Sequence, residues 1–156
     1  MELKEVVSSI GYKMAATLFK EYAIEIGIDL EFQNFDQEIA NIGEQYTRPE
    51  GAIFIAYANK NMAVGCTGVR KLDDDICELK RMYIRKTARG GGIAHKLLEK
   101  AITVAIVLGY SKMRLDTLSS MVGAIHIYEK AGFYEIAPYR FNPISGAKFY
   151  ELELKG

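Results

Sequence analysis

Three consecutive glycines (Gly90 to Gly92) stand between a strand-like segment and a long helical pattern. Glycine permits backbone conformations and close approaches that a side chain would prevent. The first amides of the following helix lack partners within that helix, and the helix dipole adds positive potential at the same place. The segment therefore predicts an anion site, most naturally for a phosphate or pyrophosphate, to which Lys86, Arg89 and Lys96 could add positive charge.

Two commoner phosphate-binding motifs do not fit this turn. A Walker A loop ends in Gly-Lys-Ser/Thr, whereas Gly92 is followed by Ile93 and Ala94. A dinucleotide-binding turn needs a further glycine where His95 stands, after a strand of a parallel sheet. A strand-to-helix turn that only needs flexibility remains as the plain alternative, because a glycine cluster by itself is weak evidence for a ligand.

A second motif lies downstream, where residues 124–133 read AIHIYEKAGF. Together with Arg89-x-x-Gly92-x-Ala94, it resembles two signature elements of the Gcn5-related N-acetyltransferase (GNAT) family. The resemblance is good from about Cys66 onward, and the order of elements before that point is compatible with it. It implies an N-acetyltransferase that uses acetyl-CoA as cosubstrate and an amine as acceptor.

The resemblance also implies how the coenzyme is held. The glycine turn would bind the pyrophosphate through its amides, and the end of the preceding strand would pair its backbone with the pantetheine arm. The family often has an asparagine seven residues before the tyrosine of the second motif; here Met121 stands there, which leaves that contact to Ser119 or Ser120. The implied coenzyme-binding residues are Met82, Tyr83, Ile84, Arg89, Gly90, Gly91, Gly92, Ile93, Ala94, Ser119, Tyr128 and Lys130.

Tyr128 matches the tyrosine that the family places near the sulfur of coenzyme A. A phenol is protonated at neutral pH and can still donate a proton to a departing thiolate. Tyr128 is therefore the candidate general acid. The alternative is a tyrosine that packs in the core with its hydroxyl group satisfied.

Glu78 precedes Arg89 by eleven residues, which is the position of the general base in histone-type members of the family. A carboxylate near the acceptor could take the proton of the attacking amine. Strict strand alternation would put Glu78 on one face with Lys80, Met82 and Ile84. An ion pair between Glu78 and Lys80 is therefore the alternative, and it would lower the pKa of the carboxyl group and weaken it as a base.

The acceptor site is expected in the loops at 45–50 and 139–146, with four candidate contacts: Tyr46, Arg70, Tyr139 and Asn142. The amine could belong to a small molecule or a peptide. A non-catalytic acyl-CoA-binding or sensing domain is the main alternative function, and a nucleotide-binding interaction module is a third.

Composition narrows the class of protein further. The 20 Lys and Arg residues balance 20 Asp and Glu residues, so neither nucleic acid nor a membrane surface is an expected partner, while a homodimer is left open. Cys66 and Cys77 are predicted to be buried thiols, and with two histidines they offer no metal-ligand spacing. No apolar run is long enough to span a membrane and no secretory signal is present, so a cytoplasmic enzyme is expected.

The 156 residues suit one N-acetyltransferase domain over 1–156. Patterning predicts strands at 3–7, 52–57, 62–70, 76–85, 112–117, 133–136 and 147–154, and helices after Ser8 or Ser9, at 35–42, from Gly92 to Leu108 and at 121–131. This order predicts an α+β layered domain with a mixed central sheet and helices on both faces. The GNAT fold implied by the resemblance has such a sheet, mostly antiparallel, of roughly six to seven strands.

Overall fold

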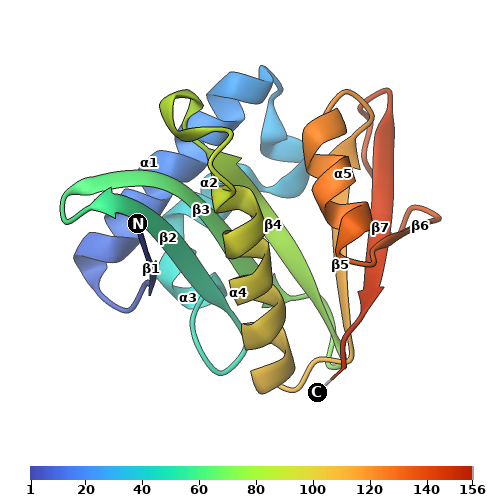
Figure 1. The fold of residues 1–156 in the computed structure, drawn as a ribbon. Helices are drawn as coiled ribbons and strands as arrows, with labels where there is room; N and C mark the ends of the chain where they lie inside the picture. The colour runs from blue at the N-terminus through green and yellow to red at the C-terminus, as the bar shows by residue number, and fades with distance from the viewer. Residues whose placement is uncertain (156) are drawn as a thin grey trace.

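A mixed sheet runs through the centre of the computed structural model, which describes residues 1–155 (Figure 1). Its strand order is β1-β2-β3-β4-β5-β7-β6, and every neighbouring pair is antiparallel except β4 and β5, which are parallel. This confirms the predicted mixed, mostly antiparallel sheet. The strands are β1 (Glu2–Glu5), β2 (Ala52–Asn59), β3 (Met62–Lys71), β4 (Ile76–Ile84), β5 (Lys112–Leu118), β6 (Tyr134–Ile136) and β7 (Ala147–Glu153).

Helices cover both faces of the sheet (Figure 1). One face packs against α1 and the short helices that follow it, and the other packs against α4 and α5, so the core has two halves. Among residues 1–155, no helix is long and apolar enough to cross a membrane. The helices are α1 (Ser9–Ile26), α2 (Phe35–Ala40), α3 (Ile42–Gln45), α4 (Ile93–Val107) and α5 (Val122–Lys130), with 3-10 turns η1 (Leu30–Gln33) and η2 (Lys86–Ala88).

Local sequence sets the ends of α1. The Ser8 side chain accepts a hydrogen bond from the amide of Gly11 at 3.1 Å, as predicted for a capping serine, and Gly27 ends the helix at φ +68°. The single helix predicted at 35–42 is instead two short helices, because Asn41 leaves helical geometry (φ −117°, ψ 27°) between them. The η1 turn was not expected from the sequence, and it carries Gln33 into the site described below.

The strands β4 and β5 are paired over only three residues. Ile76 to Glu78 lie opposite Lys112 to Arg114, and the two strands diverge beyond that point. Figure 1 shows the resulting V between the green β4 and the orange β5. Because the backbone of β4 has no strand partner on this side after Glu78, its amide and carbonyl groups are open to a ligand there.

A β-bulge in β4 changes which face its side chains occupy. The register with β3 moves from Gly68 opposite Lys80 to Cys66 opposite Tyr83, so β4 has one extra residue, and Arg81 adopts φ +57°. Glu78 and Lys80 therefore contact residues of the α1–α3 face, whereas Met82 and Ile84 pack into the core beneath α4 and α5. The prediction that all four share one face is wrong, because an inserted residue reverses the alternation.

Glu38 of α2 holds the bulge in place. Its carboxylate accepts two hydrogen bonds from the Arg81 guanidinium, at 3.1 and 2.7 Å, and a third from the Tyr46 hydroxyl at 2.9 Å. Glu38 is 1% exposed and Arg81 is 5% exposed. A left-handed conformation costs a non-glycine residue about 1 kcal/mol or more, and this buried bidentate pair offsets that cost at Arg81.

Glu38→Gln should lower the free energy of unfolding by about 3 kcal/mol, because it leaves the buried Arg81 charge without its carboxylate partner. Urea unfolding at neutral pH measures the change. Glu44→Gln on exposed α3 is the matched control and should change the free energy of unfolding by less than about 0.5 kcal/mol. Equal effects in the two variants would show that Glu38 does not stabilise the bulge.

Candidate active site

A groove of about 700 Å³ runs along the α4 and α5 side of the V. Its walls come from α1, the end of β4, the glycine turn, the start of α4 and the start of α5. Most of the predicted coenzyme-binding residues line it together, although they come from different elements. These are Met82, Tyr83, Ile84, Arg89, Gly90, Gly92, Ile93, Ala94 and Lys130.

The glycine turn has the geometry of an anion site. Gly90 (φ +90°) and Gly92 (φ +79°) adopt left-handed conformations that let the chain reverse into α4. The first helical hydrogen bond runs from the amide of Lys96 to the carbonyl of Gly92 at 3.2 Å. The amides of the three residues before Lys96 therefore have no acceptor within the helix, and they converge at the groove.

Arg89 anchors this turn to the rest of the fold. Its guanidinium donates to the carbonyl of Ile84 at 2.8 Å and forms an ion pair with Glu25 of α1 at 2.5 Å. Much of its charge is therefore balanced by Glu25. Lys130, at the end of α5, is the cation on the opposite wall of the groove.

The other three predicted coenzyme-binding residues are not part of the groove lining. Gly91 is in the turn, and an added Cβ there would meet only the carbonyl of Ala88 at 3.8 Å. Ser119 is in the turn after β5, where its amide donates to the carbonyl of Gly146, just before β7, at 2.8 Å. Tyr128 is buried, 6% exposed, beneath the α5 wall.

Tyr128 packs between α5 and the sheet, with its ring 5.7 Å from that of Phe133. Burial raises the pKa of Tyr128 well above its ordinary value of 10, and the nearby Tyr22 and Asp116 raise the pKa further. The hydroxyl group is therefore protonated at neutral pH.

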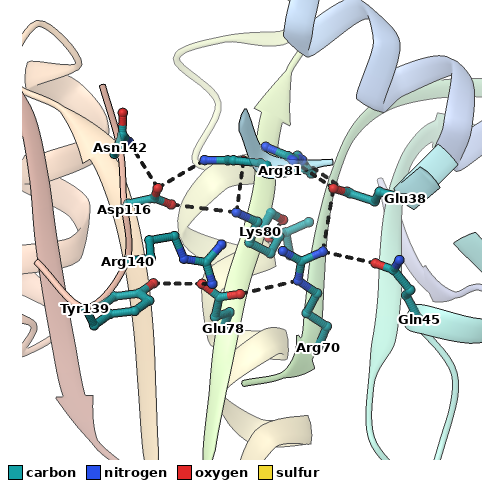
Figure 2. A network of polar contacts seen from close by, with 12 residues as sticks. Glu38, Gln45, Arg70, Glu78, Lys80, Arg81, Asp116, Tyr139, Arg140 and Asn142 are labelled. Atoms are coloured by element: carbon teal, nitrogen blue, oxygen red, sulfur yellow. Dashed lines mark hydrogen bonds and ion pairs between the residues drawn. The ribbon is translucent and has the colours of Figure 1, made fainter. Parts of the chain in front are cut away.

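A small polar pocket of about 40 Å³ lies on the opposite side of the V. Asp116 of β5 accepts hydrogen bonds from Gln33 at 3.1 Å and Asn142 at 3.2 Å, and Lys80 of β4 forms an ion pair with it at 3.7 Å across the V (Figure 2). Three residues line both this pocket and the coenzyme groove, so the two cavities meet. They are Tyr22, Ile26 and Met121.

Glu78 lies deeper, where β4 and β5 are still paired. It is 1% exposed and accepts hydrogen bonds from Arg70 at 3.3 Å, from Tyr139 at 2.8 Å and from Arg140 (Figure 2). Burial raises the pKa of Glu78, but the positive charges of Lys80, Arg140 and Arg70 outweigh burial, so the pKa lies below its ordinary value.

Glu78 does not form the ion pair with Lys80 that the sequence suggested as an alternative to a catalytic role. Its partners are Arg70 and Arg140, whereas Lys80 pairs with Asp116. Burial, together with the charge of Arg81, lowers the pKa of Lys80 to about 8. Asp116 therefore faces a cation that loses its proton more readily than an exposed lysine does.

Three of the four predicted acceptor residues lie together in the structure, and the fourth does not. Arg70, Tyr139 and Asn142 come together in the polar network with Glu78 and Asp116. Tyr46 does not face an acceptor loop: it is 0% exposed, and its ring packs in the core 5.5 Å from Phe19. This corrects the prediction for Tyr46, which serves the site only through its hydrogen bond to Glu38.

Sequence reasoning missed several members of this network: Gln33, Glu38, Arg81, Asp116 and Arg140. A usable signal was the presence of charged residues within otherwise apolar strands, since a charge inside a sheet is expected to be paired. That signal indicates buried ion pairs but does not identify their partners, which lie far away in the sequence.

The cysteines lie away from the groove, whereas both histidines line it. Cys66 and Cys77 are free and buried, as predicted. His95 and His126 are part of the groove lining, and His95 Nε2 lies 3.0 Å from the Glu99 carboxylate on the first turns of α4. Within residues 1–155, no group of three or more His, Cys, Asp or Glu side chains could hold a metal ion.

Comparisons with known proteins identify the family. The family model described as "Acetyltransferase (GNAT) family" matches residues 13–133, and the chain belongs to this family. An uncharacterized N-acetyltransferase of Schizosaccharomyces pombe is 38% identical over 138 residues, which cover 88% of this chain and 85% of that protein. This protein is accordingly an N-acetyltransferase of the GNAT family.

Solved structures agree with this assignment of the fold. A GNAT acetyltransferase from Staphylococcus aureus Mu50 superposes with a TM-score of 0.79 at 25% identity, over 99% of this chain and 100% of that one. A GNAT acetyltransferase from Elizabethkingia anophelis, solved with acetyl-CoA bound, has the same fold at a TM-score of 0.59 and 21% identity, over 78% of this chain and 82% of that one.

Gly92→Ala should lower the free energy of unfolding by about 1 kcal/mol and weaken coenzyme A binding, because alanine resists the left-handed conformation that starts α4. Gly91→Ala adds the same methyl group without a positive φ, so its unfolding free energy should change by less than about 0.5 kcal/mol. Urea unfolding and calorimetric titration with coenzyme A test both variants. Equal stability of the two would contradict the assigned role of Gly92.

Stability should fall at acid pH through the buried carboxylates. Arg81 and Arg70 hold the pKa of Glu38 below its ordinary value of 4.5 despite the opposing effect of burial, and the pKa of Glu78 is lowered likewise. A lowered folded-state pKa gives stability that is present above pH 4.5 and is lost as the pH falls below it. Urea unfolding across this range should show a shallower decline in Glu38→Gln than in the unmodified chain.

Proposed function

We propose that this chain transfers the acetyl group of acetyl-CoA directly to a primary amine of a small molecule or peptide. One observation carries the proposal: a groove of coenzyme-binding size and a polar pocket meet across the V between β4 and β5. A thioester in the V would be open to an amine that arrives from the opposite face. Direct attack through a tetrahedral intermediate then needs no covalent enzyme stage.

The coenzyme would extend along the groove. Its pantetheine arm would pair with the open backbone of β4 at Met82 to Ile84, where β5 no longer supplies a partner. Its pyrophosphate would bind the converging amides at the start of α4. This arrangement directs the sulfur toward Tyr128, whose protonated hydroxyl could supply the proton to the departing thiolate.

The two cysteines favour direct transfer over a thiol intermediate. Burial raises the pKa of Cys77 to about 12 and raises the pKa of Cys66 still more. A nucleophilic cysteine needs an accessible thiolate. Both thiols are therefore unsuited to carry the acetyl group.

Two carboxylates compete for the role of general base. Glu78, predicted from the sequence, is covered by Arg70, Arg140 and Tyr139, and it borders a separate hollow. Asp116 lines the pocket that shares three lining residues with the coenzyme groove, and it contacts the described chain through Gln33, Asn142 and Lys80. We therefore favour Asp116 as the group that takes the proton of the amine, with Glu78 as the residue that positions the arginines.

Acetyl-CoA and coenzyme A should raise the melting temperature at micromolar concentration, because each binds the folded state alone. ATP and NAD should leave the melting temperature unchanged, since neither has a pantetheine arm for the open edge of β4. Differential scanning fluorimetry makes the comparison. Stabilisation by ATP equal to that by acetyl-CoA would indicate a general nucleotide site and contradict the proposed role of the groove.

Tyr128→Phe should lower kcat on the order of 100-fold while coenzyme A binding stays unchanged, because only the proton donor is removed. Asp116→Asn should lower kcat with little change in the KM of the acceptor, whereas Glu78→Gln should mainly raise the KM of the acceptor. Thiol release with a panel of amines measures all three variants. If Glu78→Gln lowers kcat and Asp116→Asn leaves kcat unchanged, then Glu78 is the base.

A further inference from the structure

A second groove, of about 420 Å³, opens beside the polar pocket on the α1–α3 face. Arg70 and Arg140 are both part of its lining, along with four side-chain amides, and no lining residue within the described chain carries a carboxylate. From this surface we infer that the acceptor is a small amine that also bears a carboxylate, which Arg70 and Arg140 bind. The inference rests on the proposed function, since it names the substrate class of the same site.

The charges of the ion-pair network leave one positive charge in excess. Arg81, Glu38, Arg70, Glu78 and Arg140 are joined in that order, so three guanidinium groups share two carboxylates. The other pair at the site, Lys80 with Asp116, balances itself. A partly buried excess charge is costly unless it is paired, so an arriving anion would complete the network.

Arg140 has a side-chain donor that the rest of the described chain leaves unsatisfied. Its Nε atom is buried, and it has no hydrogen-bond partner among residues 1–155. A buried polar atom without a partner is rare in folded proteins and calls for an explanation such as a ligand. The guanidinium lies 5.2 Å from the centre of the Tyr139 ring, which limits the directions in which it can turn.

The second groove continues into the pocket where the amine would react. Gln33 lines both cavities and donates to Asp116 at 3.1 Å. In Figure 2, Asp116 and Lys80 lie in the upper part of the network, and Arg70, Glu78 and Arg140 lie below them. A short molecule could therefore place its amino group near Asp116 and its carboxylate over the two arginines.

The surroundings favour a carboxylate on a small molecule. Guanidinium groups form strong charge-assisted hydrogen bonds with carboxylates, and the side-chain amides of Asn34, Gln37 and Gln45 line the same groove and can supply further donors. Phe32 and Phe141 form apolar parts of the lining, and Phe141 is 74% exposed. They provide a contact surface for the carbon skeleton of an amino acid.

The test uses sets of amines that differ in the carboxylate alone. Each set contains an amino acid, its carboxamide and its decarboxylated amine, for instance L-phenylalanine, L-phenylalaninamide and 2-phenylethylamine, with matching sets for methionine and leucine. Thiol release from acetyl-CoA gives kcat/KM for each. In at least one set, the carboxylate form should exceed the other two by on the order of 100-fold, because its absence leaves the arginines unpaired.

A variant links that preference to the site. Arg140→Gln should reduce the preference to less than about tenfold through a higher KM of the carboxylate form, with little change for the carboxamide. Arg140→Lys keeps the charge but loses the bidentate geometry, so it should give an intermediate preference. Lys100→Gln on α4, which removes an exposed cation on the other face of the sheet, should keep the full preference. Melting temperature and acetyl-CoA affinity establish that each variant is folded.

Three results would overturn the inference. Equal rates for the carboxylate, carboxamide and amine forms would show that the acceptor needs no carboxylate. The proposed acetyl transfer to amines would still stand in that case. A preference for O-phosphoethanolamine over both β-alanine and ethanolamine would assign the arginines to a phosphate instead. Full retention of the preference in a folded Arg140→Gln variant would place carboxylate binding elsewhere. If no amine in the panel is acetylated, the proposed function itself fails, and the inference fails with it.

Discussion

The bidentate pair between Glu38 and Arg81 is the interaction on which the site depends. Arg81 is the extra residue of the β4 bulge and adopts a left-handed conformation that an unsupported arginine would avoid. The buried carboxylate of α2 supplies the support, and Tyr46 and Arg70 in turn orient that carboxylate. A short helix far away in sequence therefore determines the path of the central strand.

That path produces the two-sided character of the site. Before the bulge, β4 presents Glu78 and Lys80 to the α1–α3 face; after it, the strand presents Met82 and Ile84 to the face covered by α4 and α5. The divergence from β5 then leaves an opening between the faces. The polar network and the coenzyme groove approach each other at this opening because one strand borders both.

Burial of the charged side chains in the polar network costs folding free energy. A functional role therefore explains the network better than a contribution to stability does. Seven charged side chains gather where the sheet would otherwise be apolar: Glu38, Arg70, Glu78, Lys80, Arg81, Asp116 and Arg140. Well-packed apolar residues would commonly serve stability as well as buried ion pairs do or better. Charges retained at such a position are well suited to bind a charged substrate and to move a proton.

Local sequence signals account for the family assignment and predict the coenzyme end of the protein. The glycine turn, the AIHIYEKAGF segment and the order of strands and helices are local signals, because turn geometry, helix starts and hydrophobic periodicity depend on neighbouring residues. Those signals were sufficient to predict the mixed sheet, the anion site at the start of α4 and the candidate tyrosine. Apart from the division of residues 35–45 into two short helices and the unpredicted 3-10 turns, the elements agree closely with their predicted positions.

The polar network at the proposed acceptor end depends on contacts between distant segments, which the sequence does not specify. Strand alternation assigned Glu78 and Met82 to one face, and a single bulge residue separated them, since one inserted residue reverses every side chain beyond it. The ion pairs of this polar network join residues that are far apart in sequence, such as Glu78 and Arg140, which are 62 positions apart. Residue types alone cannot select among the available partners. The same holds for Tyr46, whose loop-like sequence context gave no sign that its ring would fill the core behind Glu38. Contacts between residues that are close in sequence can be inferred from the sequence. Charge pairing across the sheet depends on how distant segments come together in the fold.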